Sequence, residues 1–387
     1  MELSQVLTHL GEEREQYFRA IAPPIIQTSN FAFRDLAHMR ASFGDEFGHH
    51  LYSRGNNPTV KILREKLAAL EGTEDSLVFS SGAAAISASV TSLVQQGDHI
   101  ICVDKPYSWT KYLMTEVLPR FGVSVSFIDG RDINNFEAAL QTNTKLVYLE
   151  SPNSLTFELQ DLTAVAKFCR AKGLISLIDN SHCSPLFQRP HEYGIDLILH
   201  SATKYLCGHS DVVMGVVCGS QELIKKIFYD IYMCYGAVPT AQSASLAIRG
   251  LRTLDLRVKK SDASALELAR RLENSPKIEK VLHPLLPSFP QHELANRQMT
   301  GSGGLFSCYL KTDSKTEVEA FVDRIQRFLL AVSWGGYESL MIPSVGFYDI
   351  PGKEDSPLPF QLVRFYVGLE DVDWLWEDLE QALEVIS

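Results

Sequence analysis

Short apolar runs alternate with amphipathic segments between residues 77 and 218, and this alternation constrains the fold more than any other feature of the chain. Apolar runs of this length predict strands, and the longer segments between them predict helices. The expected strands are 77–79, 100–103, 123–128, 146–150, 174–179, 197–200 and 212–218, and the expected helices are 83–93, 107–121, 135–140 and 161–172. Repeated strand–helix units predict a mainly parallel sheet with helices on both faces, so the expected fold class is α/β.

The chain is long enough for more than one domain, because 387 residues exceed the usual limit of a single core. Residues 1–50 combine a charged segment at 11–19, expected to be helical, with an extended proline-containing piece, and we expect an arm without its own core. Further elements are expected after residue 235: a helical region at 240–272, strands at 305–310 and 362–367, and helices at 316–330 and 372–385. We therefore predict an arm at 1–50, a central domain at 51–238 and a smaller C-terminal α/β domain at 239–387.

Charge and cysteine usage narrow the class of partner and the compartment. The formal net charge is −11 and no Lys/Arg-rich run is present, which argues against nucleic acid and anionic membrane surfaces as partners. Seven scattered cysteines without a Cys-x-x-Cys pair indicate reduced, mostly buried thiols. The N-terminus lacks the pattern of a signal peptide, and no apolar run approaches the length of a membrane span. We expect a cytoplasmic protein.

One lysine stands where chemistry is expected. Lys204 lies among small hydroxyl residues in the stretch 200–211, directly after the apolar run 195–199. A lysine between a buried strand and a loop is partly desolvated, which lowers its pKa and lets the neutral amine attack a carbonyl carbon. This is the pattern of Schiff-base chemistry.

Two other segments complement that lysine. Asp179 ends the apolar run 174–179, at the position where open α/β sheets present ligand-binding groups, and it is a candidate partner for a heterocyclic nitrogen. Residues 76–86 predict a strand, a tight turn and a helix start, whose free N–H groups bind phosphate well. An aldehyde-reactive lysine, an acid for a ring nitrogen and a phosphate cradle together describe pyridoxal phosphate.

Several motifs carry a family resemblance. The segments are Tyr52-Ser-Arg54-Gly-Asn-Asn-Pro58-Thr59, Ser80-Ser-Gly-Ala83, Asp179-Asn180, Ser201-Ala-Thr-Lys204 and Ser333-Trp-Gly-Gly-Tyr-Glu-Ser339. In this order and spacing they resemble the Cys/Met-metabolism pyridoxal-phosphate enzymes, which include cystathionine β- and γ-lyases, cystathionine γ-synthase and methionine γ-lyase. The resemblance implies a fold-type I, transferase-like fold with a seven-stranded sheet. It also implies a homo-oligomer, expected to be a tetramer built from dimers that share active sites.

The resemblance also implies roles for individual residues. Lys204 binds the cofactor and acts as the base, Asp179 faces the pyridine nitrogen, and Tyr107 stacks on the ring. The phosphate is expected to contact the Gly82 and Ala83 amides, the Ser201 and Thr203 hydroxyls, and Tyr52 and Arg54 of a neighbouring subunit. The substrate is expected to contact Asn153, Ser333, Trp334 and Arg364.

The residues alone leave blander interpretations open for four of these positions. Without the family pattern, Arg54 would be a surface arginine and Tyr52 a packed tyrosine, and Tyr107 would equally well be a core aromatic. An isolated Arg364 would usually form a surface salt bridge. Its place between apolar residues in the expected strand 362–367 favours a functional role, because a buried charge requires a partner.

The branch of the family is indicated by the segment that begins at Val332. Val332-Ser333-Trp334 resembles the cystathionine β-lyase version, whereas the γ-lyase and γ-synthase branch usually carries a glutamate at the position of Val332. Trp109 stands where methionine γ-lyases typically place a cysteine, and Ala83 replaces a common methionine. We therefore expect β-elimination of L-cystathionine to homocysteine, pyruvate and ammonia. Cystathionine γ-synthase, cystathionine γ-lyase and methionine γ-lyase activities are the alternatives.

Other constellations are weaker. Five possible zinc ligands lack the spacing of a metal motif, and we expect no metal: they are His182, Cys183, His200, Cys207 and His209. Residues 208–212 resemble a nucleophile elbow, but Val212 replaces its final glycine, and the glycines at 301–304 have the wrong spacing for a dinucleotide site. A non-catalytic descendant that binds the cofactor without turnover would have lost Lys204, Asp179 or Arg364, and all three are present.

Overall fold

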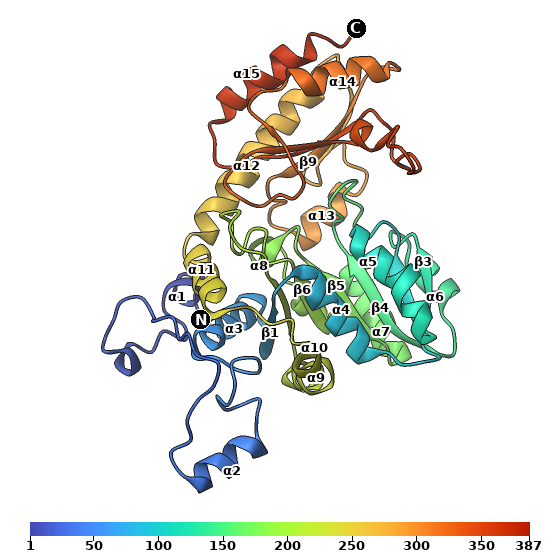
Figure 1. Ribbon diagram of the computed structural model, residues 1–387. Coiled ribbons are helices and arrows are strands. Elements are labelled where there is room, and N and C mark those ends of the chain that lie inside the picture. Colours follow the sequence, from blue (N-terminus) through green and yellow to red (C-terminus); the bar gives the residue numbers. More distant parts are fainter. The chain divides into compact units, whose positions relative to one another are not determined.

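The predicted alternation of strands and helices is present in the computed structural model, which describes residues 1–387 (Figure 1). Seven strands form one sheet in the order β1-β7-β6-β5-β4-β2-β3. Their bounds are β1 Asp75–Phe79, β2 His99–Val103, β3 Ser124–Ile128, β4 Thr144–Glu150, β5 Ile175–Asp179, β6 Leu197–His200 and β7 Gly215–Gly219. Strands β3, β2, β4, β5 and β6 are parallel, and β7 is antiparallel to β6 and β1. The mainly parallel seven-stranded sheet is confirmed.

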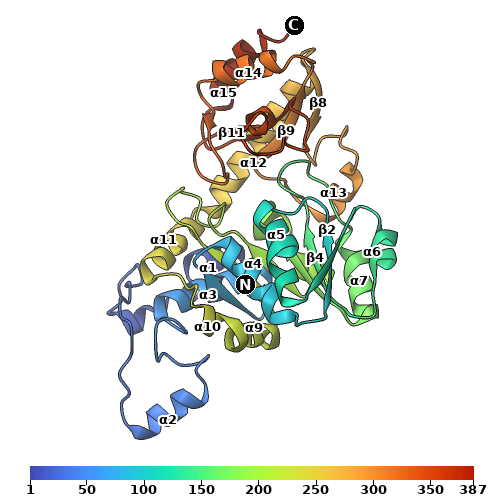
Figure 2. The same ribbon diagram turned by 45° about the vertical axis from the view of Figure 1, so that its right-hand side comes forward.

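Helices cover both faces of this sheet, as predicted (Figures 1 and 2). Successive residues of β2 point to opposite faces, so Ile100 and Cys102 join one core while Ile101 and Val103 join the other. The first core includes side chains of α4 (Gly82–Leu93) and α9 (Gln221–Ile227). The second includes side chains of α6 (Ile133–Ala139) and α7 (Leu162–Lys172). Burial on both faces explains why these strands are continuously apolar.

Helix α3 (Pro58–Glu71) begins and ends where local chemistry dictates. The side chain of Asn57 accepts a hydrogen bond from the Thr59 N–H at 3.0 Å, and Pro58 occupies the first turn, where its missing N–H costs nothing. The helix ends at Gly72, whose φ of +77° is a left-handed conformation that suits glycine. This end places Glu71 in the protein interior.

Some predicted helices differ from the observed ones. Residues 107–121 form α5 (Ser108–Tyr112), a π-helical turn (Leu113–Val117) and a 3-10 turn (Leu118–Phe121), because Pro119 has no N–H to continue an α-helical ladder. The helix expected at 316–330 ends earlier: α14 covers Lys315–Arg324. The carboxylate of Asp378 then accepts the N–H groups of Gln326 and Arg327, which turns the chain into β10 (Leu329–Leu330).

The N-terminal helix prediction was wrong in position. Within the range 11–19, where a helix was expected, Phe18 and Arg19 have φ values of 56° and 61°, which are incompatible with a helix at its end. The observed elements are α1 (Leu3–Thr8) and a 3-10 turn at Arg14–Tyr17, followed by α2 (Leu36–Gly44). The expected strand at 212–218 starts three residues late, as β7, and several short elements were not predicted: α8 Ser184–Phe187, a 3-10 turn at Pro190–Tyr193, a π-helical turn at Phe228–Tyr232, α10 Met233–Tyr235, β8 Ile278–Leu282, α13 His292–Gln298, β11 Leu340–Pro343 and a 3-10 turn at Ser344–Phe347.

The chain divides into two compact units. The first comprises Met1–Ser151, Gln160–Cys207 and Asp211–Leu254, and the second comprises Pro152–Leu159, Gly208–Ser210 and Asp255–Ser387. The expected helical region at 240–272 is α11 (Ala241–Leu251) and α12 (Leu254–Glu273), and the units divide inside it. The domain boundary at 238/239 lies upstream of that division and stays a prediction.

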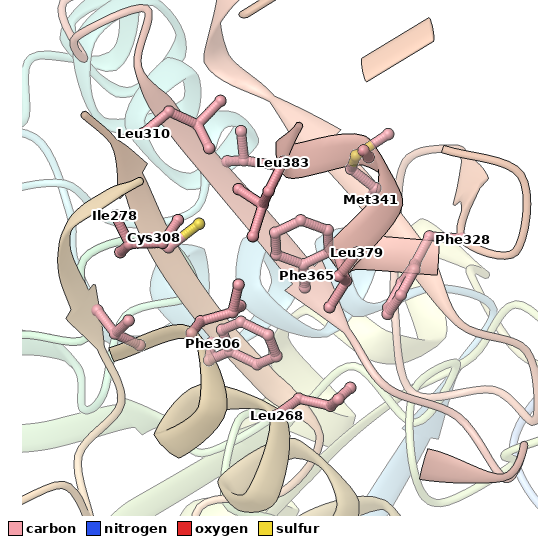
Figure 3. Close-up of a cluster of buried hydrophobic side chains, with 14 of the residues drawn as sticks. Leu268, Ile278, Phe306, Cys308, Leu310, Phe328, Met341, Phe365, Leu379 and Leu383 are labelled. Carbon is pink, nitrogen blue, oxygen red and sulfur yellow. The ribbon is translucent and has the colours of Figure 1, made fainter. Parts of the chain in front are cut away.

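The second unit contains a five-stranded sheet in the order β10-β11-β12-β9-β8. Its central strands are β12 (Leu362–Tyr366) and β9 (Leu305–Leu310), which pair antiparallel, and both agree closely with the expected strands. Phe306 and Phe365 lie between this sheet and side chains of α12, α14 and α15 (Val372–Leu383) in one apolar core (Figure 3). No helix of either unit combines the length and apolar composition required to cross a membrane.

Candidate functional site

The carboxyl ends of β5 and β6 bring the predicted acid and lysine segments together. The two strands are parallel neighbours, with Asp179 paired in register with Leu199. Asp179 Oδ1 accepts hydrogen bonds from the Ser181 N–H at 3.0 Å and the Ser181 hydroxyl at 2.6 Å. Ser181 Oγ in turn accepts the N–H of Ser201 at 2.6 Å. Ser181 therefore orients the carboxylate and ties it to the segment that carries Lys204.

This role of Ser181 was not among the sequence-based predictions. Its signal was its position two residues after an acid at a strand end, where a short hydroxyl side chain bonds its local neighbours. The contact that matters, to Ser201, spans twenty residues of sequence and follows from the pairing of β5 with β6. Such a contact becomes visible only when the strand order is known.

The electrostatic environment of Asp179 contains opposing effects. Burial raises the pKa of the Asp179 carboxyl, while the hydrogen bonds from Ser181 and then the charges of His200 and Lys204 lower it. The net direction is upward. A carboxyl in this position responds strongly to any added positive charge, because a low-dielectric surrounding strengthens charge interactions. A protonated ring nitrogen would supply such a charge.

The start of α4 offers a phosphate cradle. Ser81 caps this twelve-residue helix by accepting the Ala84 N–H at 3.0 Å. The N–H groups of Gly82 and Ala83 have no partner in the protein, as expected for the first turn of a helix. A Cβ atom on Gly82 would lie 3.1 Å from Ser201 Oγ, so the helix start and this hydroxyl approach closely. Two free donors beside a hydroxyl group fit a phosphate.

The Thr203 hydroxyl already forms two hydrogen bonds within the protein. It donates to the carbonyl of Met214 at 3.1 Å and accepts the Met214 N–H at 2.9 Å. A hydroxyl has only one proton to donate, so a donated bond to phosphate would require this hydroxyl to rotate. In the present arrangement Thr203 braces the lysine segment, and its predicted phosphate contact stays a prediction.

Tyr107 precedes α5 at the end of β2. Its backbone N–H donates to Glu150 Oε2 at 2.7 Å, and Glu150 is the last residue of β4. The side chain is 42% exposed rather than part of the core. Burial, followed by the negative charges of Asp179 and Glu150, raises the pKa of the Tyr107 phenol. The phenol therefore keeps its proton near neutral pH.

Tyr52 and Arg54 lie on an exposed loop before α3. The Arg54 guanidinium carbon is 5.5 Å from the centroid of the Tyr52 ring, a cation–π arrangement. No carboxylate of the chain forms an ion pair with Arg54. An exposed arginine without an acidic partner is free to bind the phosphate held by a neighbouring subunit, and that contact stays a prediction.

Arg364 of the second unit is a buried cation without an acidic partner. It lies on β12 and is 7% exposed. Its Nη1 donates to the Ser154 carbonyl at 3.2 Å and its Nη2 donates to the Ser333 carbonyl at 3.0 Å, and no carboxylate pairs with it. Burial lowers the pKa of Arg364 to about 10, so the group stays charged at pH 7. An unpaired buried guanidinium predicts an anionic ligand, and a carboxylate fits its planar fork.

The segment beside Arg364 is strained at one residue. Ser333 has a φ of +81°, which is unusual for a residue other than glycine, and Gly335 follows with a φ of +90°. Trp334 between them is buried, whereas Val332 is 76% exposed. Such strain persists where the surrounding structure fixes it, as at ligand-binding sites.

Asn153 uses its amide within its own loop. Its Oδ1 accepts the N–H groups of Leu155, Thr156 and Phe157 at 2.9 to 3.1 Å, and its Nδ2 donates to Thr156 and Glu158. These bonds organise the segment that presents the Ser154 carbonyl to Arg364. A direct substrate contact by Asn153 requires some of them to break, and that contact stays a prediction.

Metal and disulfide chemistry find no support in the geometry. No three His, Cys, Asp or Glu side chains gather into a set that would hold a metal ion. All seven cysteines are free thiols, and six of them are buried. Burial raises the pKa of the Cys308 thiol to about 12, which leaves it unreactive at neutral pH.

Comparisons with known proteins agree with the family resemblance. The model of the family described as "Cys/Met metabolism PLP-dependent enzyme" matches residues 4–384. Cystathionine gamma-lyase of Mus musculus is 39% identical over 382 residues, covering 97% of this chain and 94% of that protein. L-methionine gamma-lyase of Pseudomonas putida is 36% identical over 381 residues, covering 97% and 96%. The crystal structure of metB from Corynebacterium glutamicum has a TM-score of 0.92 at 32% identity, covering 100% of this chain and 99% of that one.

Proposed function

Because the chain belongs to the Cys/Met-metabolism family of pyridoxal-phosphate-dependent enzymes, we propose that it cleaves a carbon–sulfur bond of a sulfur amino acid, with L-cystathionine as substrate and β-elimination as the preferred reaction. The products are homocysteine, pyruvate and ammonia, and one water is consumed. Pyridoxal phosphate, when bound, supplies the sink for the electron pair that is freed at the substrate Cα. The residues of the chain bind the cofactor, orient the substrate and transfer protons.

The observation that carries the choice of β-elimination is the segment at Val332. The γ-branch usually places a glutamate there, whose carboxylate would bind the distal ammonium of the substrate. Val332 is instead an exposed side chain without charge. A β-elimination requires removal of the α-proton alone, whereas γ-chemistry requires a further proton transfer at Cβ. The sequence Ser333-Trp334 after this valine supports the same branch.

The cofactor would be held by residues of the first unit. The Gly82 and Ala83 amides and the Ser201 hydroxyl bind the phosphate, and Tyr52 and Arg54 of a neighbouring subunit add a phenol and a guanidinium. Asp179, oriented by Ser181, holds a proton on the ring nitrogen by its negative charge. Tyr107 supplies an aromatic face and a neutral phenol.

Lys204 moves the proton. The neutral Lys204 Nζ would take the α-proton of the substrate, and the resulting ammonium would donate that proton to the sulfur as the Cβ–S bond breaks. Homocysteine leaves as a thiol. Lys204 is a neutral amine again once the sulfur has taken its proton, and the remaining three-carbon fragment would react with one water to give pyruvate and ammonia.

Arg364 fixes the orientation of the substrate. Its guanidinium, held by the Ser154 and Ser333 carbonyls, binds the α-carboxylate through two parallel hydrogen bonds. A fixed carboxylate determines which Cα bond is aligned for cleavage, and alignment of this kind contributes a large share of catalysis.

γ-Elimination is the second candidate, and the names of the relatives favour it. Proteins named cystathionine gamma-lyase and L-methionine gamma-lyase are 36 to 40% identical to this chain over nearly its whole length. On L-cystathionine, γ-elimination would produce cysteine and 2-oxobutyrate instead of homocysteine and pyruvate. Identification of the keto acid is therefore sufficient to distinguish the two reactions.

The test is a product assay with L-cystathionine. The protein loaded with pyridoxal phosphate is incubated with the substrate, and keto acids and thiols are separated and quantified, with Lys204→Ala as the blank. Pyruvate with homocysteine supports the proposal, and 2-oxobutyrate with cysteine replaces it by γ-elimination. If neither pair forms although the protein binds the cofactor, cystathionine is the wrong substrate.

A further inference from the structure

Glu71 is a buried carboxylate in an unfavourable place. It is the last residue of α3, and its side chain is fully buried. The C-terminal end of a helix carries a partial negative charge, so an acid there is destabilised unless it is compensated. Removal of a carboxylate from water adds a further cost. The partners of Glu71 therefore have to offset both effects.

Both partners of Glu71 lie at the ends of the two strands that carry the proposed cofactor site. Glu71 Oε1 accepts a hydrogen bond from His200 Nε2 and lies 3.4 Å from Asn180 Nδ2. His200 ends β6 directly before Ser201, and Asn180 directly follows Asp179. One carboxylate oxygen thus contacts the neighbours of both Asp179 and Ser201, while Oε2 has no hydrogen-bond partner.

The Asn180 amide bonds Gln188 as well as Glu71. Its Nδ2 donates to the Gln188 carbonyl at 2.8 Å, and its Oδ1 accepts from Gln188 Nε2 at 2.9 Å. Gln188 Nε2 also donates to the Ser151 carbonyl at 2.8 Å. The end of β5 is therefore locked to its surroundings on the side that faces Glu71. The network is buried, and Glu71 Oε2 and Gln188 Oε1 are two of its oxygens without a hydrogen-bond partner.

Charge connects Glu71 to Asp179 through His200. The His200 charge favours the ionised form of Asp179 and so lowers the pKa of that carboxyl. The other titratable groups that act on or respond to Asp179 are Lys204, Tyr107 and Tyr148. Glu71 itself is faced by His200 and by the thiol of Cys218, whose pKa is raised first by burial and then by the Glu71 charge. Glu71 Oε1 bonds the imidazole nitrogen Nε2 of His200, so the Glu71 carboxylate contacts the side chain whose charge acts on Asp179.

We propose that Glu71 is a positioning residue for the cofactor: through its contacts with His200 and Asn180 it holds the ends of β5 and β6, and with them Asp179, in place for the ring nitrogen of pyridoxal phosphate. This inference rests on the role proposed above for Asp179. It predicts that Glu71 affects cofactor binding only as long as Asp179 carries its charge.

The experiment is a double-mutant cycle on cofactor affinity, measured without substrate. Apoenzyme of the wild type, Glu71→Gln, Asp179→Asn and the double variant is titrated with pyridoxal 5'-phosphate, and the dissociation constant is obtained from absorbance. Glu71→Gln keeps the shape of the side chain and removes its charge. We expect it to weaken binding about tenfold in the wild-type background and about twofold or less in the Asp179→Asn background.

A spectroscopic readout and a second variant accompany the cycle. The absorbance of the bound cofactor is recorded against pH, and its midpoint is expected to shift in Glu71→Gln. His200→Gln should reproduce the loss of affinity, which keeps the test informative if Glu71→Gln misfolds. The matched control is His99→Gln. His99 is also buried and bonded to two hydroxyls, those of Thr144 and Ser126, but it is the first residue of β2 and so lies at the amino ends of the parallel strands, away from their carboxyl ends. It should leave affinity unchanged.

The outcomes separate this inference from the proposed function. Equal affinity of Glu71→Gln and wild type, or an equal loss in both backgrounds, overturns the role of Glu71 and leaves that of Asp179 intact. Wild-type affinity in Asp179→Asn overturns the proposed role of Asp179 and the inference with it. Thermal unfolding of the apoenzymes reports any general loss of structure, which alone would not abolish the coupling to Asp179.

Discussion

Arg364 donates a hydrogen bond from Nη2 to the carbonyl oxygen of Ser333 at 3.0 Å, and Ser333 presents that oxygen from a left-handed backbone conformation. A serine is rarely found at a φ of +81°, so the carbonyl is turned toward the arginine at a conformational cost. The guanidinium is thereby held by neutral acceptors alone, and its charge is left for a ligand.

Arg364→Lys should impair substrate binding although it keeps the charge. A lysine cannot form the planar pair of hydrogen bonds, and we expect kcat/KM for L-cystathionine to fall about 100-fold, mainly through KM. Steady-state kinetics measure the effect. The matched control is Arg324→Lys, because Arg324 of the same unit bonds Gln381 and Glu384 at the surface. A variant with wild-type KM would contradict the carboxylate assignment.

Gly82→Ala should weaken binding of pyridoxal phosphate about tenfold, since even one methyl group at residue 82 crowds the Ser201 side chain. The added Cβ would lie 3.0 Å from Ser201 Cβ, so the hydroxyl or the helix start has to move. Cofactor titration of the apoenzyme checks this. Ala83→Gly, which keeps the backbone N–H, should bind nearly as the wild type does; equal binding by both variants would speak against the cradle.

Val332→Glu should shift the products toward γ-elimination. The new carboxylate restores the charge that the γ-branch carries at this position, and the exposed side chain has room for it. The ratio of 2-oxobutyrate to pyruvate formed from L-cystathionine is expected to rise. Val332→Gln, of similar size and without charge, is the control, and an unchanged ratio in Val332→Glu would remove this residue from the explanation of specificity.

A mixture of two inactive variants should recover activity if neighbouring subunits share active sites. Arg54→Ala removes the group expected to serve a neighbour, and Lys204→Ala removes the base of its own subunit. Coexpressed in equal amounts, the two variants pair at random, so about half of the dimers are mixed. Each mixed dimer contains one intact site of two, and the whole population is expected to have about a quarter of the wild-type activity per subunit. No recovery in isolated mixed oligomers would mean that Arg54 serves its own subunit.

His283 should make the second unit sensitive to acid. This histidine is buried, and burial followed by the charge of Arg270 lowers its pKa to about 3. Because an unfolded histidine titrates near pH 6.5, the unfolded state binds the extra proton between these values, and stability falls as the pH drops from 6.5 toward 3. Between pH 7 and pH 5 this group alone should cost about 2 kcal/mol.

Urea unfolding of the apoenzyme at both pH values tests this expectation. His283→Gln removes the titrating group, so its free energy of unfolding should change less between pH 7 and pH 5 than that of the wild type. His9→Gln, at an exposed histidine of the N-terminal segment, is the control. The same pH dependence in wild type and His283→Gln would contradict the buried neutral state.

Local signals in the sequence were sufficient for much of the fold. Asn57 and Pro58 mark the start of α3, and the largely apolar run at 305–310 gives β9 with its observed bounds. Pro119 was visible as well, and its missing N–H is a local signal against the single helix expected at 107–121. The turn after α14 depends on Asp378, more than fifty residues away, and no local pattern shows such a contact.

In the candidate site, too, local signals were predictable and contacts between distant residues were not. Lys204, Asp179 and the helix start at Gly82 are placed at strand ends by short apolar runs, which the sequence displays. Glu71 contacts His200 across 129 positions, and its role depends on strand order and on the place where α3 ends. Likewise, the use of the Asn153 amide within its own loop is a matter of rotamer and backbone, which residue identity does not reveal.

The interleaving of the two compact units limits how this chain can be recombined with its relatives. The second unit takes Pro152–Leu159 and Gly208–Ser210 from within the first, and the Leu155 carbonyl accepts a hydrogen bond from the Ser307 hydroxyl. A chimera made with a single crossover near residue 254 would join foreign sequence to two native segments that it did not evolve with. A faithful exchange of the second unit requires three grafts in one gene, with the graft at 208–210 placed only four residues beyond Lys204.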